Sequence, residues 1–347
     1  MKKIKMKQTI FQKLKISGRY RIYQGGKLVG EGENIITNVG LELILQRLCN
    51  SQLFPKFIEI GTHDFGGSPS VVDQTDTTLF QSIAGATVDV GGGRLEFHDD
   101  ARQEMLGRER NLTTPKNKVL IEFISDWPGE RTTNVNQKKI TEAGIFNRYK
   151  LGSMLSHFQT SPIITIKESI PYSVAWELQV EISDDAGLSG GIVYDGLNII
   201  SNTILQKQNN DENIQNQISL DFSCTHIGCG SGVTPVNPND TDLNVPFPLG
   251  VPFAGVNGLR RITGFKIDTA VPAKPTLTFQ RYINEFMFPS EIKEVGLFNV
   301  REETYQDGIK GQRTRIQTMF GRAVLETPIP ANTESLIDFK ISIERGI

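Results

Sequence analysis

The chain has 347 residues, with 37 Lys and Arg against 39 Asp and Glu and a formal net charge of −2. This length predicts about two domains of ordinary size, and the near balance of charge excludes an overall field that would draw the chain to nucleic acid or to an anionic membrane. Three Cys and four His exclude a disulfide framework and leave few ligands for a metal, whereas 33 Gly and 16 Pro indicate a turn-rich, mainly β chain.

The first fifteen residues concentrate positive charge. They contain no acid and six lysines, Lys2, Lys3, Lys5, Lys7, Lys13 and Lys15. Their apolar residues are isolated, which excludes the continuous core of a signal peptide. We therefore expect residues 1–15 to form a basic arm that binds an acidic neighbouring subunit. Nucleic acid is an unlikely partner, and the simpler alternative is a solvated first strand.

The next elements read as a hairpin and a helix. Tyr20–Val29 has two glycines, Gly25 and Gly26, at its middle, which can adopt the positive φ of a tight turn. After Asn38 as N-cap, apolar residues recur at helical spacing and predict a helix. They are Leu41, Ile44, Leu45 and Leu48.

A comparison of the chain with itself finds five blocks that recur in the same order. Gly26–Asn38 matches Gly190–Asn202, and Thr75–Leu79 matches Asn239–Leu243, both at an offset of 164. The remaining pairs are Glu142–Asn147 with Glu294–Asn299, Met154 with Met319, and Trp176–Ile182 with Ile337–Ile343. Convergent strand patterning is the alternative explanation. We interpret the blocks as a duplication, with a first unit over residues 16–182 and a second over residues 183–347.

The second unit predicts the same elements in a weaker form. A turn is expected near Ser189–Gly191, and the helix that follows Asn202 falls on the polar segment Gln206–Gln217. Both units end in a strand that alternates apolar and polar residues, Val174–Ile182 and Ile337–Ile343. The predicted fold is mainly β, with two tandem and similar antiparallel β-sandwich domains of jelly-roll type, each with one short helix.

No segment carries a strong catalytic or metal-binding signature. Cys224, His226 and Cys229 lack a fourth ligand, and the string Gly228, Gly230, Gly232 precedes prolines rather than a helix, so turn glycines are expected rather than a phosphate loop. His98-Asp99-Asp100 reads as a solvated loop. The chain is predicted to be no enzyme and to hold no cofactor and no metal. Its short apolar runs exclude a membrane-spanning helix.

The motifs NIITNVGLELIL, FIEIGT with TDTTL, and EAGIFN with EVGLFN together resemble a recurring class of virion proteins from tailed bacteriophages. That class shows a "GTG…P…DT.L" turn followed by an "E.GLFN" strand. The present chain departs from it at Thr62-His63 and at Cys229. The resemblance implies a structural protein of the virion that self-associates and binds other virion proteins. Within the signature, core or interface positions are expected at Gly144, Ile145, Phe146, Gly296, Leu297 and Phe298.

The leading hypothesis is a non-enzymatic component of the tail, neck, collar or baseplate, assembled as a symmetric oligomer or ring. A capsid decoration or head-fibre protein is the alternative within this class. A carbohydrate- or host-receptor-binding module is the alternative from another class, and Trp127 beside Asp126 is its best candidate for contact with a glycan.

Overall fold

The structure is a computed structural model of the whole chain. It describes residues 6–49, 57–61, 72–80, 102–104, 106–110, 117–127, 139–147, 152–167, 169–183, 190–205, 224–247, 259–283, 291–305, 312–330 and 333–346.

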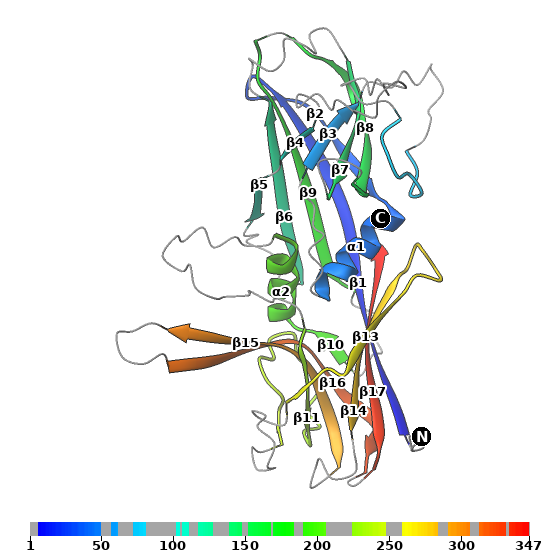
Figure 1. Cartoon of the computed structure of the whole chain (residues 1–347), viewed down its shortest axis with the longest axis vertical. Coiled ribbons are helices and arrows are strands. Elements are labelled where there is room, and N and C mark those ends of the chain that lie inside the picture. The colour runs from blue at the N-terminus through cyan, green and yellow to red at the C-terminus, as the bar shows by residue number, and fades with distance from the viewer. Residues whose placement is uncertain are drawn as a thin grey trace, which may run out of the picture.

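One long strand, β1 (Met6–Gln24), runs along most of the molecule (Figure 1). Its side chains alternate between exposed and buried from Lys7 to Tyr20, as expected of a strand with one wet and one packed face. Its first part pairs in parallel with β17 (Ser335–Arg345), from Met6 to Ile16. Its second part pairs antiparallel with both β2 (Lys27–Ile36) and β9 (Tyr172–Ile182).

The larger sheet has 12 strands and is built around β1. From the first half of the chain it also takes β2, β3 (Phe57–Gly61), β4 (Arg102–Glu104), β5 (Leu106–Arg110), β6 (Lys118–Trp127), β7 (Lys139–Phe146), β8 (Met154–Thr165) and β9. From the second half it takes β13 (Gly264–Asp268), β14 (Thr276–Ile283) and β17. Strands of both predicted units therefore share one sheet.

The smaller sheet has five strands, all from the second half, in the order β10-β16-β15-β11-β12. Their bounds are β10 (Gly190–Ile192), β11 (His226–Gly230), β12 (Arg260–Arg261), β15 (Ile292–Tyr305) and β16 (Gln312–Ile329). Two helices, α1 (Asn38–Leu48) and α2 (Tyr194–Leu205), lie in the middle of the molecule (Figure 1). Arg47 Nε of α1 donates to the Thr203 carbonyl oxygen of α2 at 2.7 Å.

Several predicted elements are confirmed. Gly25 and Gly26 have φ values of 55° and 77° and form a two-residue turn between the paired Gln24 and Lys27, the geometry that positive φ at both central positions gives. The helical stripe of α1 is buried, and the two closing strands are β9 and β17. The chain is mainly β, with one short helix in each half of the described chain.

Other expectations are wrong in detail. The N-cap of α1 is Thr37, whose hydroxyl accepts the Gly40 N–H at 2.9 Å, because Asn38 already belongs to the helix. The second helix is α2, which covers Asn198–Asn202, and Gly190 and Gly191 lie in β10 rather than in a turn. Most of the block Gly190–Asn202 is thus helical, whereas most of the segment matched to it, Gly26–Asn38, is the strand β2. The segment Gln206–Gln217 lies outside the described residues.

The pairing is also not purely antiparallel, since β1 and β17 are parallel. Antiparallel pairs are joined by short hairpins, whereas parallel pairs need a long connection. Here the connection is almost the whole chain. The first strand of the chain, β1, therefore pairs with the last strand, β17.

Candidate functional site

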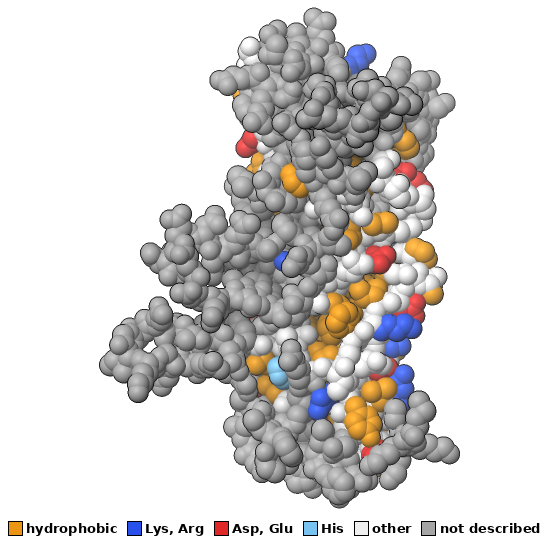
Figure 2. Space-filling view, viewed as in Figure 1, with side chains coloured by type: hydrophobic (Ala, Val, Ile, Leu, Met, Phe, Trp, Pro, Cys, Tyr) orange, Lys and Arg blue, Asp and Glu red, His pale blue; other side chains and the backbone are white. Residues whose placement is uncertain are grey.

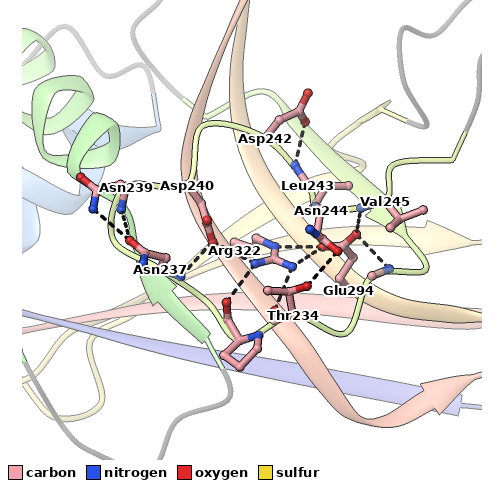
Figure 3. A network of polar contacts seen from close by, with 12 residues as sticks. Thr234, Asn237, Asn239, Asp240, Asp242, Leu243, Asn244, Val245, Glu294 and Arg322 are labelled. Carbon is pink, nitrogen blue, oxygen red and sulfur yellow. Dashed lines mark hydrogen bonds and ion pairs between the residues drawn. The ribbon is translucent and has the colours of Figure 1, made fainter.

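A buried ion-pair network lies between the smaller sheet and the loop that follows β11 (Figure 3). Arg322 of β16 is 1% exposed and Glu294 of β15 is 0% exposed, with Nη2 and Oε2 2.7 Å apart. Arg322 Nη1 contacts Asp240 Oδ2 at 2.9 Å. The guanidinium also donates to the carbonyl oxygens of Thr234 and Pro235. We call Arg322, Glu294 and Asp240 the arginine cluster.

Glu294 anchors the same loop a second time. Its carboxylate accepts the N–H groups of Gly232 at 3.0 Å, Val245 at 2.7 Å and Asn244 at 3.0 Å. A Cβ at Gly232 would lie 2.4 Å from Glu294 Oε1, and one at Gly230 would lie 2.6 Å from it. Two glycines of the GxGxG string are therefore needed for the close approach of a carboxylate. The loop binds an acidic side chain of its own chain, which a phosphate-binding loop would not.

A second cluster lies in the first half of the chain. His157 of β8 is 0% exposed, and its two ring nitrogens face two carboxylates. Nδ1 lies 2.7 Å from Asp76 Oδ2, and Nε2 lies 2.8 Å from Glu142 Oε2. Glu142 also accepts the N–H of Phe80 at 3.1 Å. We call Asp76, Glu142 and His157 the histidine cluster.

The two clusters occupy corresponding positions. His157 pairs with Gly144 across β7 and β8, and Arg322 pairs with Gly296 across β15 and β16. Glu142 and Glu294 each come two residues before that glycine. Two residues after each glycine, Phe146 pairs with Met154 and Phe298 pairs with Met319, in both hairpins directly after a shift in the register.

The turns that supply the third carboxylate also match. Asp76 accepts the Asp73 N–H at 2.8 Å, and Asp240 accepts the Asn237 N–H at 2.9 Å. Each turn then contacts the start of a helix. The Gln74 carbonyl oxygen accepts the Asn38 N–H at 2.8 Å, and the Pro238 carbonyl oxygen accepts the Tyr194 N–H at 2.9 Å.

The signature residues of the sequence motifs thus meet in space. Asp76 of TDTTL joins Glu142 of EAGIFN through His157, and Asp240 of NDTDL joins Glu294 of EVGLFN through Arg322. The remaining signature residues lie in the core: Ile145, Phe146, Leu297 and Phe298 are buried. A Cβ at Gly144 would lie 2.8 Å from the Met154 sulfur, and one at Gly296 would lie 2.7 Å from the Phe298 ring.

Neither cluster is arranged for acid–base catalysis. A histidine that moves protons keeps one ring nitrogen for its substrate or nucleophile. In His157 both nitrogens face carboxylates and the side chain is fully buried. At the corresponding position Arg322 carries a guanidinium, which does not release its proton. Both clusters instead fix loops against strands.

The cysteine-rich segment has the properties of core structure. Cys224 and Cys229 are buried free thiols, and His226 Nδ1 lies 2.8 Å from the Thr225 hydroxyl. Burial raises the pKa of the Cys49 thiol to about 12. Burial, with the nearby Cys49, also raises that of Cys224. Within the described ranges, no three His, Cys, Asp or Glu side chains are grouped to hold a metal.

The predicted basic arm was expected to bind a neighbouring subunit, but its described residues belong to a strand of the larger sheet. Lys2, Lys3 and Lys5 lie outside the described residues, whereas Lys7, Lys13 and Lys15 belong to β1. Lys7 Nζ lies 2.9 Å from Asp338 Oδ2 on β17. Because Ile10 and Leu14 between these lysines are buried, the described part of the arm is a strand of its own chain's sheet. His98-Asp99-Asp100 and the Trp127 side chain also lie outside the described part.

A hollow of about 640 Å³ lies where β17 and β2 end side by side against β1. Arg345 at its edge is fully engaged: it donates to the Ile36 carbonyl oxygen, to Asn38 Oδ1 and to Gln74 Oε1. Arg19, Glu33, Asn34, Glu177 and Gln179 are among the residues that line the hollow. None of these contacts assembles a nucleophile with a base.

Sequence reasoning missed His157 and Arg322, the residues that join the motifs. The signal was present, because each lies three residues after the matched methionines, Met154 and Met319. A basic side chain at the same distance from the matched methionine in both halves would have identified them.

No family model matches the chain, and neither a curated protein nor a solved structure matches it. Among the described helices, none is both long and apolar enough to cross a membrane.

Proposed function

We propose that this chain is a non-enzymatic structural protein of a bacteriophage virion, placed in the tail, neck or baseplate region and assembled as a symmetric oligomer. The observation that carries the proposal is that residues of the sequence motifs, far apart along the chain, contact the same buried side chain. Asp76 and Glu142, and Asp240 and Glu294, belong to the motifs that resemble those of virion proteins. Each pair contacts one buried side chain, that of His157 or Arg322.

The clusters supply a mechanism for such a role. Buried charges that are fully hydrogen-bonded hold loops in one arrangement, since any other arrangement would leave a charge unpaired in the interior. The arginine cluster holds the segment Gly232–Val245, and the histidine cluster holds Asp73–Phe80. Rigid loops on a rigid sheet offer neighbouring subunits a fixed surface, which assembly of a particle requires.

The two halves add a second argument. Each half presents a helix, a turn and a hairpin joined by the same contacts. A ring of n such chains would present 2n similar faces to the next component. That property suits an adaptor between components whose copy numbers differ.

The proposal is tested on purified virions of the phage that encodes the chain. An antibody to the chain, used in immunogold microscopy, is expected to label the tail, neck or baseplate, and light scattering of the pure protein is expected to give a fixed oligomer. Label on the capsid would favour a decoration or head-fibre role. Virions that lack the chain, or a monomer that binds glycans on an array, would overturn the proposal.

A further inference from the structure

A two-stranded ribbon extends from the smaller sheet. The described strands β15 and β16 pair from Ile292 with Ile329 out to Tyr305 with Gln312. Strand β11 pairs with β15 only as far as Phe298, and β10 pairs with β16 only over Gly321–Ala323. Figure 1 shows the two strands continuing away from the body of the molecule.

Contacts with the body of the molecule hold the base of these two strands. The Thr225 hydroxyl bonds the Val300 backbone at both N–H and carbonyl oxygen, and Gln317 Nε2 donates to Asp242 Oδ2 at 3.2 Å. Beyond these two residues, Arg301–Tyr305 and Gln312–Ile316 pair only with each other among the described strands. We call these two segments the ribbon.

The corresponding hairpin of the first half has no ribbon. There Phe146 pairs with Met154, which is 8 residues on, whereas Phe298 pairs with Met319, which is 21 residues on. The second hairpin is therefore 13 residues longer at the same register. Since the first half forms the matching cluster without these residues, the ribbon serves something other than the core.

A ribbon of two strands that pairs with no third strand has little stability of its own in water. Among the described strands, none pairs with either outer edge of this ribbon, so both edges can offer backbone N–H and carbonyl groups to a partner. Such an edge is stabilised when it pairs with the edge of another sheet.

The same chain carries a suitable edge at β13. This strand ends the larger sheet and pairs only with β14 in the described structure. Its five residues, Gly264–Asp268, equal in number each strand of the ribbon. Phe265 on this strand is 58% exposed, as is Val271 in the turn that follows. Figure 2 shows hydrophobic side chains at the surface, next to charged ones, in the part of the view where Figure 1 labels β13.

We propose that the ribbon of one copy binds the β13 edge of a second copy and extends that copy's larger sheet. The apolar side chain of Phe265 would be covered in this contact. Because the ribbon and β13 belong to different sheets, the contact is head-to-tail, and it generates a ring when the rotation closes. The inference specifies the oligomer contact of the proposed function and rests on it for its biological setting.

The first variant removes the ribbon without disturbing its base. Residues 301–316 are replaced by Asn-Gly, which closes the paired Val300 and Gln317 with a two-residue turn. The second variant is Phe265→Lys, which adds a charge to the exposed edge. The control is Ile163→Lys on β8, whose side chain is also exposed, at 57%. This strand belongs neither to the ribbon nor to the β13 edge.

Light scattering at about 100 μM should show an oligomer for the wild type and for Ile163→Lys. Phe265→Lys should weaken association about tenfold or more, equivalent to about 1.4 kcal/mol, and the ribbon-less chain should be a monomer with an unchanged circular dichroism spectrum. A mixture of the ribbon-less chain with an excess of Phe265→Lys, at concentrations where each alone is monomeric, should form a complex of two chains, because the ribbon of Phe265→Lys can bind the intact β13 edge of the ribbon-less chain. The ribbon-less chain mixed with the wild type should cap it and shorten the assembly, because it offers β13 but no ribbon.

An oligomer of wild-type mass in the ribbon-less chain overturns the proposal, and so does a wild type that stays monomeric. Normal association of Phe265→Lys excludes β13 as the receiving edge and overturns it as well. These outcomes are read in pure protein. They are therefore distinct from absence of the chain from virions, which would overturn the proposed function alone.

Discussion

At Arg322 and His157 the same structural position is filled by two different nitrogen-bearing side chains. Arg322 distributes its hydrogen bonds over Glu294, Asp240 and two carbonyl oxygens. His157 has only two ring nitrogens, and each faces one carboxylate. The fork of arginine therefore binds two backbone carbonyl oxygens in addition to its two carboxylates.

Removal of the guanidinium should be costly. In Arg322→Gln the 0%-exposed Glu294 would lose its ion-pair partner in the interior, so we expect the free energy of unfolding to fall by about 3–5 kcal/mol. Urea denaturation followed by fluorescence measures this change. Lys274→Gln is the control, since Lys274 is 61% exposed in its pair with Glu344 and such pairs contribute less than about 1 kcal/mol. Equal losses in the two variants would contradict the argument.

The raised pKa of the Cys49 thiol predicts how fast this thiol reacts at a given pH. Its pKa in the folded chain is about 12, raised from 9.0 by burial, so the reactive thiolate is about a thousandfold scarcer at pH 8 than in the unfolded chain. We expect iodoacetamide to label Cys49 far more slowly in native protein than in urea, as measured by mass spectrometry.

The sign of the linked stability follows from the same shift. Because the folded state keeps the thiol proton to higher pH, this contribution is complete below pH 9 and is lost as pH rises from 9.0 towards about 12. A Cys49→Ser variant should therefore lose less stability than the wild type between pH 8 and pH 10. Rapid labelling of native Cys49 would show that the thiol is accessible.

At the scale of elements, each helix lies against a strand at one glycine. A Cβ at Gly40 of α1 would lie 2.1 Å from the Leu155 carbonyl oxygen, and one at Gly196 of α2 would lie 2.1 Å from that of Phe320. Both oxygens belong to backbone, which cannot rotate away. The close approach brings each helix onto the hairpin that carries its cluster.

Alanine at either glycine should therefore destabilise the chain. A helix normally gains about 1 kcal/mol from Gly to Ala, but here the added methyl group forces the helix from the strand, and we expect a loss of about 1–3 kcal/mol. Thermal unfolding of Gly40→Ala and Gly196→Ala measures it. Gly264→Ala is the control, because nothing lies within 4 Å of its Cβ position. A stabilised Gly40→Ala variant would contradict the packing argument.

At the scale of the molecule, β1 joins the two halves. It pairs with β17 over Met6–Ile16 and with β9 over Leu14–Gln24, so the same strand holds the last strand of each half. The hydrophobic core is likewise continuous between the two halves. Buried side chains of both halves, among them Trp176 and Phe339, belong to one continuous cluster.

This shared strand predicts cooperative unfolding. Although the sequence divides into two similar units, we expect one thermal transition in calorimetry, because neither half keeps its sheet without β1. Residues 183–347 expressed alone should lack cooperative unfolding, since β17 then has an open edge in place of β1. The same fragment preceded by residues 1–24 through a flexible linker is the matched control. Two separate transitions, or a fragment that folds alone, would show that the halves are independent.

The sequence alone determined the local structure. The mainly β class, the Gly25-Gly26 turn, the buried stripe of α1 and the strands β9 and β17 follow from turn chemistry and from periodicity, which depend on neighbours along the chain. The burial of Ile145, Phe146, Leu297 and Phe298 was also expected from the motifs.

Tertiary structure decided what depends on distant partners. Residues 6–15 look like a basic arm, because nothing local reveals that β17 lies beside them in parallel. Gly190–Asn202 was matched to a strand by identity, although its Gly196 is placed by a contact with Phe320. His157 and Arg322 gained a role only when Asp76, Glu142, Asp240 and Glu294 surrounded them. A histidine or an arginine in a strand is ordinary by itself, and it gains a specific role when the fold buries it between carboxylates from other elements.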